Sequence, residues 1–442
     1  MDKHKELKEL FNKGFTSLEN RLNGGTKGEL HTYRKDALKR FNELRFPTIK
    51  DEEWKYTNIS PVIAKYFKPS ADSAVIADAK GVDRFFINRN DFIHLVFVNG
   101  RFSDELSFGW KETEGFTVTN LKTAIKDKPE IVSGYIGKNA VIEDNIFTAL
   151  SSAFIEDGTF IYVNKNTVVE KPVHIFYVTN SNEEIMNAPR NLFIAGANSQ
   201  IKVIESYEAL SSAAYFTNVV TEIFLEEGAV VEHIKIQDEA LGAYHIARTE
   251  VSQKKASNYL SYNVDFGGSI VRNNLHTRFD ESGAENNLRG LYLTSGSQLV
   301  DNHTRIDHAM PHCLSHELYK GVLNDSSRAV FNGKVMVRKD AQKTNAFQEN
   351  KNLLLSEDAL VNTKPQLEIF ADDVKCTHGA TVGQLSKDSL FYLKSRGFSH
   401  DTAMRVLIYA FASDVVHAID IPEIRDYLEK KIAEKLATGL EN

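Results

Sequence analysis

The residues best suited to chemistry lie together near the end of the chain, in the segment 375–379, which reads Lys-Cys-Thr-His-Gly. If this segment is a strand, Cys376 and His378 point to the same side, because side chains alternate between the two faces of a strand. Such a pair offers one soft and one borderline metal ligand, or a thiol beside a base. Two ligands are too few for a stable metal site, so a partner chain would have to complete it. The alternative is a buried free cysteine beside a hydrogen-bonded histidine.

A second group of candidate ligands surrounds Cys313 and consists of His303, His308, His312 and His316. Pro311 argues against one helix that would carry His308 and His312. In an extended segment His308, His312 and His316 share one face, but they lie too far apart to close a metal shell without a bend. We therefore expect structural histidines that are hydrogen-bonded within turns. A free-standing metal-binding β-helix protein that uses the His303–His316 cluster remains the alternative function.

Motifs of common enzyme classes are absent from the sequence. It has no Gly-x-x-x-x-Gly-Lys-Ser/Thr loop, no Gly-x-Gly-x-x-Gly after a strand, no Gly-x-Ser-x-Gly elbow and no Cys-x-x-Cys pair. Asp372 and Asp373 are an acidic pair near the candidate site, but neighbouring strand residues face opposite sides, which argues against a carbohydrate-active enzyme. With two cysteines, the chain cannot supply a four-cysteine cluster from its own thiolates.

Composition and charge narrow the class of protein. The 442 residues are more than one compact core usually holds, so we expect two or three domains. A net charge of −7 argues against a general nucleic-acid binder, which needs a basic surface. The first residues lack the apolar core of a signal peptide, and the apolar run 406–412 is too short to span a bilayer. We therefore expect a cytoplasmic protein that binds neither nucleic acid nor membrane.

The spacing of the hydrophobic residues divides the chain into three regions. These regions must position the candidate site residues. Helical spacing predicts an N-terminal helical region over 1–78 and a C-terminal one over 376–442. The first of these ends in a polar loop that we expect to be anchored by two buried aromatic residues, Trp54 and Tyr56. Between them, over 79–375, short runs alternate apolar and polar residues, as strands do.

The C-terminal region carries clear helix-start signals. Ser386 or Asp388 is placed to cap the first helix of this region, Ser399 to cap the second, and Pro422 suits the first turn of a third. A helical piece at this place could cover the end of the β region, dock a partner, or do both.

Small-residue turns recur along the β region and set its period. They fall at 196–198, 228–230, 255–257, 283–285, 296–298, 326–328, 340–342 and 358–360. Several successive turns lie about 27–32 residues apart, which indicates stacked coils with more than one corner each. A β-sandwich would place its turns about every 8–12 residues. The spacing therefore favours a β-solenoid.

Several segments of the chain resemble the SufB/SufD family of iron–sulfur cluster assembly proteins. The most specific is 364–383, which reads Lys-Pro-Gln-Leu-Glu-Ile-Phe-Ala-Asp-Asp-Val-Lys-Cys-Thr-His-Gly-Ala-Thr-Val-Gly. The others are 51–58, 319–323, 328–334, 340–345, 352–356 and 391–398. They extend the resemblance over nearly the whole chain. Because Cys-Thr-His-Gly-Ala-Thr stands at 376–381 and additional cysteines are lacking, the chain is more similar to the SufD type than to the SufB type.

The resemblance implies a fold and a set of partners. The fold is mainly β, a right-handed parallel β-helix between N-terminal and C-terminal α-helical regions. The chain would act as a non-catalytic scaffold subunit that pairs with a SufB-like subunit through late β-helix strands. A SufC-like ABC-type ATPase, to which ATP hydrolysis belongs, would dock on the C-terminal helices at about 384–442. Without its partner the isolated chain could form a homodimer through the same strands.

The resemblance also implies roles for the two candidate residues. His378 would contribute to a nascent-cluster site at the partner interface, as a metal ligand shared with the partner chain, and Cys376 would assist it. The iron–sulfur cluster or iron would be transient there, with no cofactor held stably by this chain alone. Help in acquiring iron is a further role that the resemblance suggests. Cys313 is not counted among the ligands.

Overall fold

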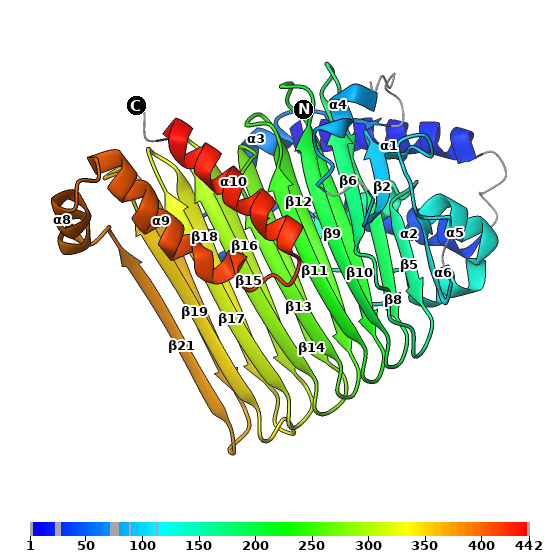
Figure 1. Cartoon of the computed structure of the whole chain (residues 1–442). Coiled ribbons are helices and arrows are strands. Elements are labelled where there is room, and N and C mark those ends of the chain that lie inside the picture. The colour runs from blue at the N-terminus through cyan, green and yellow to red at the C-terminus, as the bar shows by residue number, and fades with distance from the viewer. Residues whose placement is uncertain (1–2, 23–27, 71–78, 88–89, 112–113, 440–442) are drawn as a thin grey trace.

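The computed structural model describes residues 3–22, 28–70, 79–87, 90–111 and 114–439 of the chain. Most of these residues form a solenoid of two long sheets (Figure 1). The first sheet contains β1 (Lys68–Pro69), β4 (Phe116–Asn120), β5 (Thr159–Val163), β7 (Ile185–Asn187), β8 (Arg190–Ala195), β10 (Phe216–Leu225), β12 (Tyr244–Gln253), β14 (Ile270–Phe279), β16 (Leu299–His308), β18 (Arg328–Val337) and β20 (Leu360–Ile369).

The second sheet faces the first across the core. It contains β2 (Ile93–Val98), β3 (Arg101–Phe102), β6 (Val173–Thr179), β9 (Gln200–Ala209), β11 (Val230–Asp238), β13 (Asn258–Asp265), β15 (Glu285–Thr294), β17 (Leu314–Leu323), β19 (Asn345–Leu354) and β21 (Lys375–Gly383). From β8 onward the chain alternates between the two sheets, and each strand pairs in parallel with the strand two places later.

The register confirms the period expected from the turns. Asn258 pairs with Glu285, 27 residues later, and Leu314 pairs with Asn345, 31 residues later. Coils of this length, stacked in parallel, form a β-solenoid, and a β-sandwich is excluded. The mainly β fold, a parallel β-helix with helices at both ends, is therefore confirmed.

One corner of the solenoid repeats the same backbone geometry in six successive coils. A residue with positive φ turns the chain, and the next residue is small and fully buried. The turning residues are Asn198, Gly228, Ala256, Gly283, His312 and Lys343. The buried residues that follow them are Ser199, Ala229, Ser257, Ala284, Cys313 and Thr344. Small side chains fit here because neighbouring coils approach each other closely at the corner, so Cys313 occupies a packing position.

The helices lie outside the two sheets, and several of them cover the outer faces of the sheets. They are α1 (Lys3–Leu22), α2 (Glu29–Glu43), the 3-10 helix η2 (Glu52–Trp54), α3 (Ser60–Ile63), α4 (Ala79–Asp83), α5 (Leu121–Asp127), α6 (Pro129–Tyr135), α7 (Ile146–Ala153), α8 (Lys387–Ser395), α9 (His400–Val416) and α10 (Pro422–Gly439). Helices α1, α2 and α7 pack on the outer face of the first sheet, where Phe41 and Phe147 share a cluster with Phe216 and Ile246.

The C-terminal helices lie across the outer face of the second sheet. Ile408 of α9 and Leu428 of α10 are fully buried against outward-facing strand residues such as Ile234 and Leu291. Figure 1 shows α9 and α10 crossing the strands while α8 extends past β21. Of the alternatives left open for this region, covering the end of the solenoid does not describe α9 and α10, because their apolar residues pack on the face of the second sheet.

The predictions for the helix caps and for the two aromatic residues of the N-terminal loop were confirmed only in part. The Ser386 and Ser399 side chains accept hydrogen bonds from the backbone of the first turns of α8 and α9, so Ser399 is confirmed as a cap and Ser386, not Asp388, is the cap of α8. Of the two aromatic anchors, Trp54 is buried but Tyr56 is 44 % exposed, beside Lys55. The Trp54 ring lies between the Phe147 ring, with ring centres 5.6 Å apart, and the Arg272 guanidinium, 3.8 Å from the ring centre. The predicted burial is therefore confirmed for Trp54 and wrong for Tyr56.

The second sheet extends past the boundary expected at 375/376. Residues Lys375–Gly383 form β21 in full register with β19, and the first C-terminal helix begins at Lys387. Among the described residues, no helix is long and apolar enough to cross a lipid bilayer.

Candidate functional site

The solenoid ends in two strands that are paired on one side. β20 pairs with β18 and β21 pairs with β19, and they are the last strands of the first and second sheets. Most residues of β21 are exposed and most of β20 are half-buried, whereas the preceding strands are largely buried. Strand edges of this length present a row of backbone donors and acceptors that another strand can pair with. The end of the solenoid is therefore open.

Cys376 and His378 lie on the inner side of this open end. Cys376 is the register partner of Ala346, and His378 is the register partner of Gln348. Ala346 and Gln348 are buried inside the solenoid, while Phe347 between them is exposed on its outer side. The predicted shared face of Cys376 and His378 is therefore the face that continues the interior of the solenoid. Since no later coil covers it, His378 is exposed to solvent.

The two side chains differ in their surroundings. Cys376 is half-buried against the inner core, and this burial raises the pKa of its thiol above the usual value. A thiol in this state keeps its proton at neutral pH, so metal binding there must displace a proton. Among the described residues, no three histidine, cysteine or acidic side chains gather closely enough to hold a metal ion. Cys376 and His378 alone therefore do not make up a metal site.

A column of polar residues lies beneath His378 in the interior. Glu317, Gln348 and His378 are aligned by register on β17, β19 and β21. The amide nitrogen of Gln348 donates a hydrogen bond to Oε2 of Glu317 over 2.5 Å. Burial raises the pKa of Glu317 to about 7. The column places a neutral amide between a buried acid and the exposed imidazole.

The histidine cluster around Cys313 is dispersed by the fold. His303 is buried on β16 with its imidazole 2.9 Å from Asp301, and His308 shares a 2.9 Å hydrogen bond with Ser315 inside the solenoid. His316 lies exposed on β17, on the outer side. The predicted shared face of His308, His312 and His316 is wrong, because the backbone turns at His312, where φ is +60°.

The acidic pair also lies elsewhere than on a strand. Asp372 and Asp373 occupy the turn before β21, and Asp373 forms an ion pair with Lys343. Cys313 is a buried free thiol near the carbonyl oxygens of Glu281 and Pro311.

Exposed apolar side chains surround the open end of the solenoid. They were not predicted from the sequence. Phe347 is 42 % exposed on the outer face of β19, and Phe370 is 63 % exposed directly after β20. On α8, Phe391 and Tyr392 are 75 % and 57 % exposed. Apolar residues at the outward parity of a strand are the signal that could have identified Phe347.

Comparisons with known proteins agree with this architecture. The family model described as "SUF system FeS cluster assembly, SufBD core domain" matches residues 177–411, and that of the "SufBD protein N-terminal region" matches residues 1–175. An iron–sulfur cluster assembly SufBD family protein of Synechocystis sp. is 34 % identical over 90 % of both chains.

Two relatives are named iron–sulfur cluster assembly protein SufD. The one from Escherichia coli is 31 % identical over 89 % of this chain and 90 % of its own length. The one from Bacillus subtilis is 26 % identical over 92 % and 94 %. With both family models matched from end to end of the solenoid, the chain belongs to the SufBD family of the SUF iron–sulfur cluster assembly system.

Proposed function

We propose that this chain is the SufD-type scaffold subunit of a SUF assembly complex, a non-catalytic protein that helps to form a nascent-cluster site. The open end of the solenoid carries this proposal. There, two long strand edges flank an inward-facing thiol and an exposed imidazole that cannot hold a metal alone. The names of the relatives from Escherichia coli and Bacillus subtilis support the SufD type.

A SufB-type subunit is the partner that we assign to the open end. Pairing through β20 and β21 would continue both sheets into the partner and bury Cys376 and His378 at the join. His378 supplies one borderline ligand, and the partner supplies the soft thiolates that iron–sulfur clusters require. The cluster, or its iron, is then cargo that is held transiently between two chains. Cys376 assists at the same site once a metal displaces its proton.

The C-terminal helices are assigned to a SufC-type ATPase. α8 has no buried residue, and its Phe391 and Tyr392 face solvent next to the open end. An apolar surface of this kind, rimmed by polar residues, is typical of a protein–protein contact. ATP hydrolysis belongs to that partner, and its movement would reach the cluster site through the neighbouring β21.

Without a SufB-type partner, the same edges can pair with a second copy of the chain. A two-fold arrangement would make each copy contribute the same strands to an isologous interface. The same surface would then form either the heterodimer or the homodimer, but not both at once.

Strand pairing between β21 and the SufB-type partner can be tested at a single peptide group. Because Lys375 donates its N–H to Thr344 and successive N–H groups of a strand point to opposite edges, the N–H of Ala380 points to the open edge. Ala380→Pro removes that donor and should abolish capture of the SufB-type partner in co-expression, whereas Ala380→Val keeps the donor and should preserve capture. Undiminished capture by the proline variant would rule out pairing through this edge.

The role of His378 is tested on the assembled complex. Complexes that carry His378→Ala should purify with unchanged subunit ratios but contain much less iron and acid-labile sulfide. His316→Ala, which removes another exposed histidine from the outer face of β17, is the matched control and should assemble clusters normally. Full iron and sulfide content in the His378→Ala complex would refute the assigned role.

A further inference from the structure

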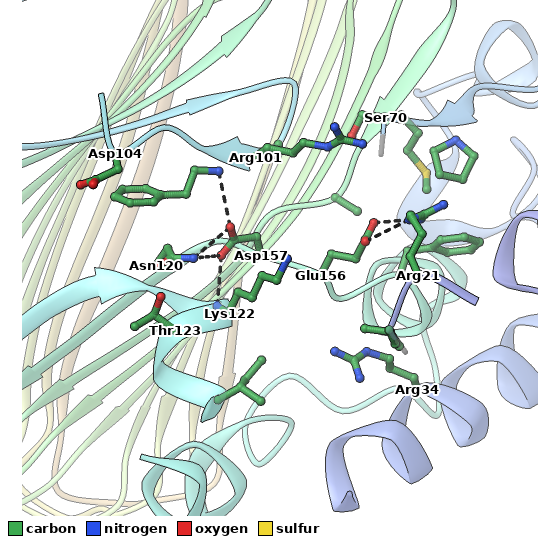
Figure 2. Close-up of a pocket in the computed structure, with 18 of the residues that line it drawn as sticks. Arg21, Arg34, Ser70, Arg101, Asp104, Asn120, Lys122, Thr123, Glu156 and Asp157 are labelled. Carbon is green, nitrogen blue, oxygen red and sulfur yellow. Dashed lines mark hydrogen bonds and ion pairs between the residues drawn. The ribbon is translucent and has the colours of Figure 1, made fainter. Parts of the chain in front are cut away.

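A second site lies at the opposite end of the molecule, in a cleft between the N-terminal helices and the first coils of the solenoid. The cleft has a volume of about 860 Å³, within the usual range for small-molecule sites. Figure 2 shows its polar side, with side chains from α1, α2, α5 and the segment after α7 directed into one space. None of the residues discussed above for cluster assembly lines it.

Arg34 forms the floor of the cleft and is incompletely paired. The residue is 3 % exposed, and its Nε donates a 2.8 Å hydrogen bond to the carbonyl oxygen of Ile155. Among the residues that the structure describes, none accepts a hydrogen bond from its two terminal nitrogens. Burial lowers the pKa of Arg34 to about 10, and Glu156 opposes that shift. A buried guanidinium with free donors is costly unless an anion compensates it.

The acid that acts on Arg34 is already engaged. The Glu156 carboxylate accepts hydrogen bonds from Arg21 over 3.1 and 3.4 Å, in a two-pronged arrangement visible in Figure 2. Two guanidinium groups therefore share one carboxylate. Asp157 is likewise engaged, because the Asn120 amide and the backbone N–H groups of Lys122 and Gly158 donate to it. Glu156 therefore compensates the charge of Arg34 without a hydrogen bond to it, and Asp157 is occupied by its own donors.

Lys122 adds a second cation from the other side. Its side chain extends from α5 into the cleft, on the side of Asp157 and Glu156 (Figure 2). Within the described part of the chain, its ammonium group has no hydrogen-bond or ion-pair partner. Converging, unshared cations from α2 and α5 are the arrangement that binds a carboxylate or phosphate group.

One part of the lining is apolar and aromatic. Phe102 and Trp110 pack edge to face with ring centres 5.3 Å apart, and Phe154 and Met186 also line the cleft. An inorganic anion would leave this surface uncovered. A ligand with an apolar body would cover it while placing its charged group at Arg34.

We propose that this cleft binds a small organic anion, a carboxylate or phosphate monoester with an aromatic or aliphatic body, with its charged group between Arg34 and Lys122 and its body against Phe102 and Trp110. The proposal does not rest on the role in cluster assembly, since the cleft and the open end of the solenoid share no residue.

Isothermal titration calorimetry of the full chain tests the proposal with three probes: phenyl phosphate, benzoate and inorganic phosphate. We expect saturable one-site binding of phenyl phosphate or benzoate, and the tighter of the two identifies the anionic group. Inorganic phosphate should bind at least about tenfold more weakly, because it covers no apolar surface. Equal binding of inorganic phosphate, or no saturable heat with any probe at millimolar concentration, would overturn the proposal.

Variants locate the bound anion. Lys122→Gln should weaken binding of the better organic probe by about tenfold or more, as expected for loss of one charge-assisted contact. Lys126→Gln is the matched control, because Lys126 is exposed on the same helix and does not line the cleft. Arg34→Gln should abolish binding, and if that buried substitution prevents folding, Lys122→Gln alone decides. Unchanged affinity in Lys122→Gln, or an equal loss in Lys126→Gln, would contradict the site.

Discussion

Gln348 donates its side-chain hydrogen bond to Glu317 inside the solenoid, directly beneath the open coil that carries His378. This hydrogen bond joins the buried side chain beneath His378 to the carboxyl group of Glu317, whose ionisation is disfavoured by burial. Because burial raises the pKa of Glu317 from 4.5 to about 7, the folded state binds this proton more tightly than the unfolded chain does.

The first prediction is a pH dependence of stability. The contribution of Glu317 is fully present below pH 4.5 and is lost as pH rises to about 7, by about 3 kcal/mol in free energy of unfolding. Glu317→Gln keeps an acceptor for Gln348 but cannot ionise. As pH rises from 4.5 to about 7, the free energy of unfolding of this variant should therefore increase relative to that of the parent protein. Urea unfolding at about pH 5 and about pH 8 measures the difference. An equal pH slope in both proteins would show that Glu317 ionises normally.

A second prediction concerns the anchor of the N-terminal loop. Arg272 bonds Asp301 over 2.6 Å, both side chains are buried, and its guanidinium lies on the Trp54 ring. Burial alone would raise the pKa of Asp301, but Arg272 and His303 hold it at about 2. Arg272→Ala leaves that carboxylate uncompensated and should cost about 3–5 kcal/mol of unfolding free energy.

The control for this change is Arg278→Ala on the same strand, β14. The Arg278 side chain is 56 % exposed, so its loss should cost less than about 1 kcal/mol. Chemical denaturation of both variants makes the comparison. Similar small losses would mean that Trp54 is held by packing alone.

A third prediction tests the close approach of neighbouring coils. A Cβ added to Gly321 on β17 would lie 2.1 Å from Cε2 of Tyr292 and 2.5 Å from Oδ1 of Asn352, so Gly321→Ala must displace a buried ring. We expect a loss of about 1–3 kcal/mol, the usual cost of overpacking. Gly134→Ala, in α6 with open space around it, should be neutral or stabilising. Thermal unfolding distinguishes the two.

A fourth prediction separates docking from folding on α8. Phe391→Asp should strongly reduce capture of the SufC-type ATPase without lowering the thermal stability of the isolated chain, because the ring is 75 % exposed. Leu241→Asp, at a 66 % exposed position in the turn after β11, is the matched control and should capture the ATPase normally. Normal capture by the Phe391 variant would place the docking surface elsewhere.

Much of the architecture could be predicted from the sequence because it depends on local signals. Alternating apolar residues and small corner residues recur within each coil, so the strands and their period can be read without knowing the register. The shared face of Cys376 and His378 followed in the same way, since residues two apart on a strand always share a face. The same rule does not apply to His308 and His316, because the backbone turns at His312 and places them on two different strands.

Features that join distant coils could not be predicted in this way. The column of Glu317, Gln348 and His378 depends on coils of 31 and 30 residues that are stacked without slippage, and a change of one residue in either loop would break it. Arg34 carries no signal of burial in its own segment, because helix α7 and the chain after it close over it from more than a hundred residues away.

The position of α9 and α10 after the last strand has a consequence for synthesis of the chain. Domains begin to fold from the N-terminus as they leave the ribosome, and the coils of a solenoid contact only their neighbours, so stacking can proceed as the strands emerge. The second sheet nevertheless keeps a bare apolar flank until α9 and α10 arrive to cover Ile234 and Leu291. A chain without these two helices would display that flank to chaperones and proteases. Copies that carry both helices would therefore be the ones that persist to meet a partner.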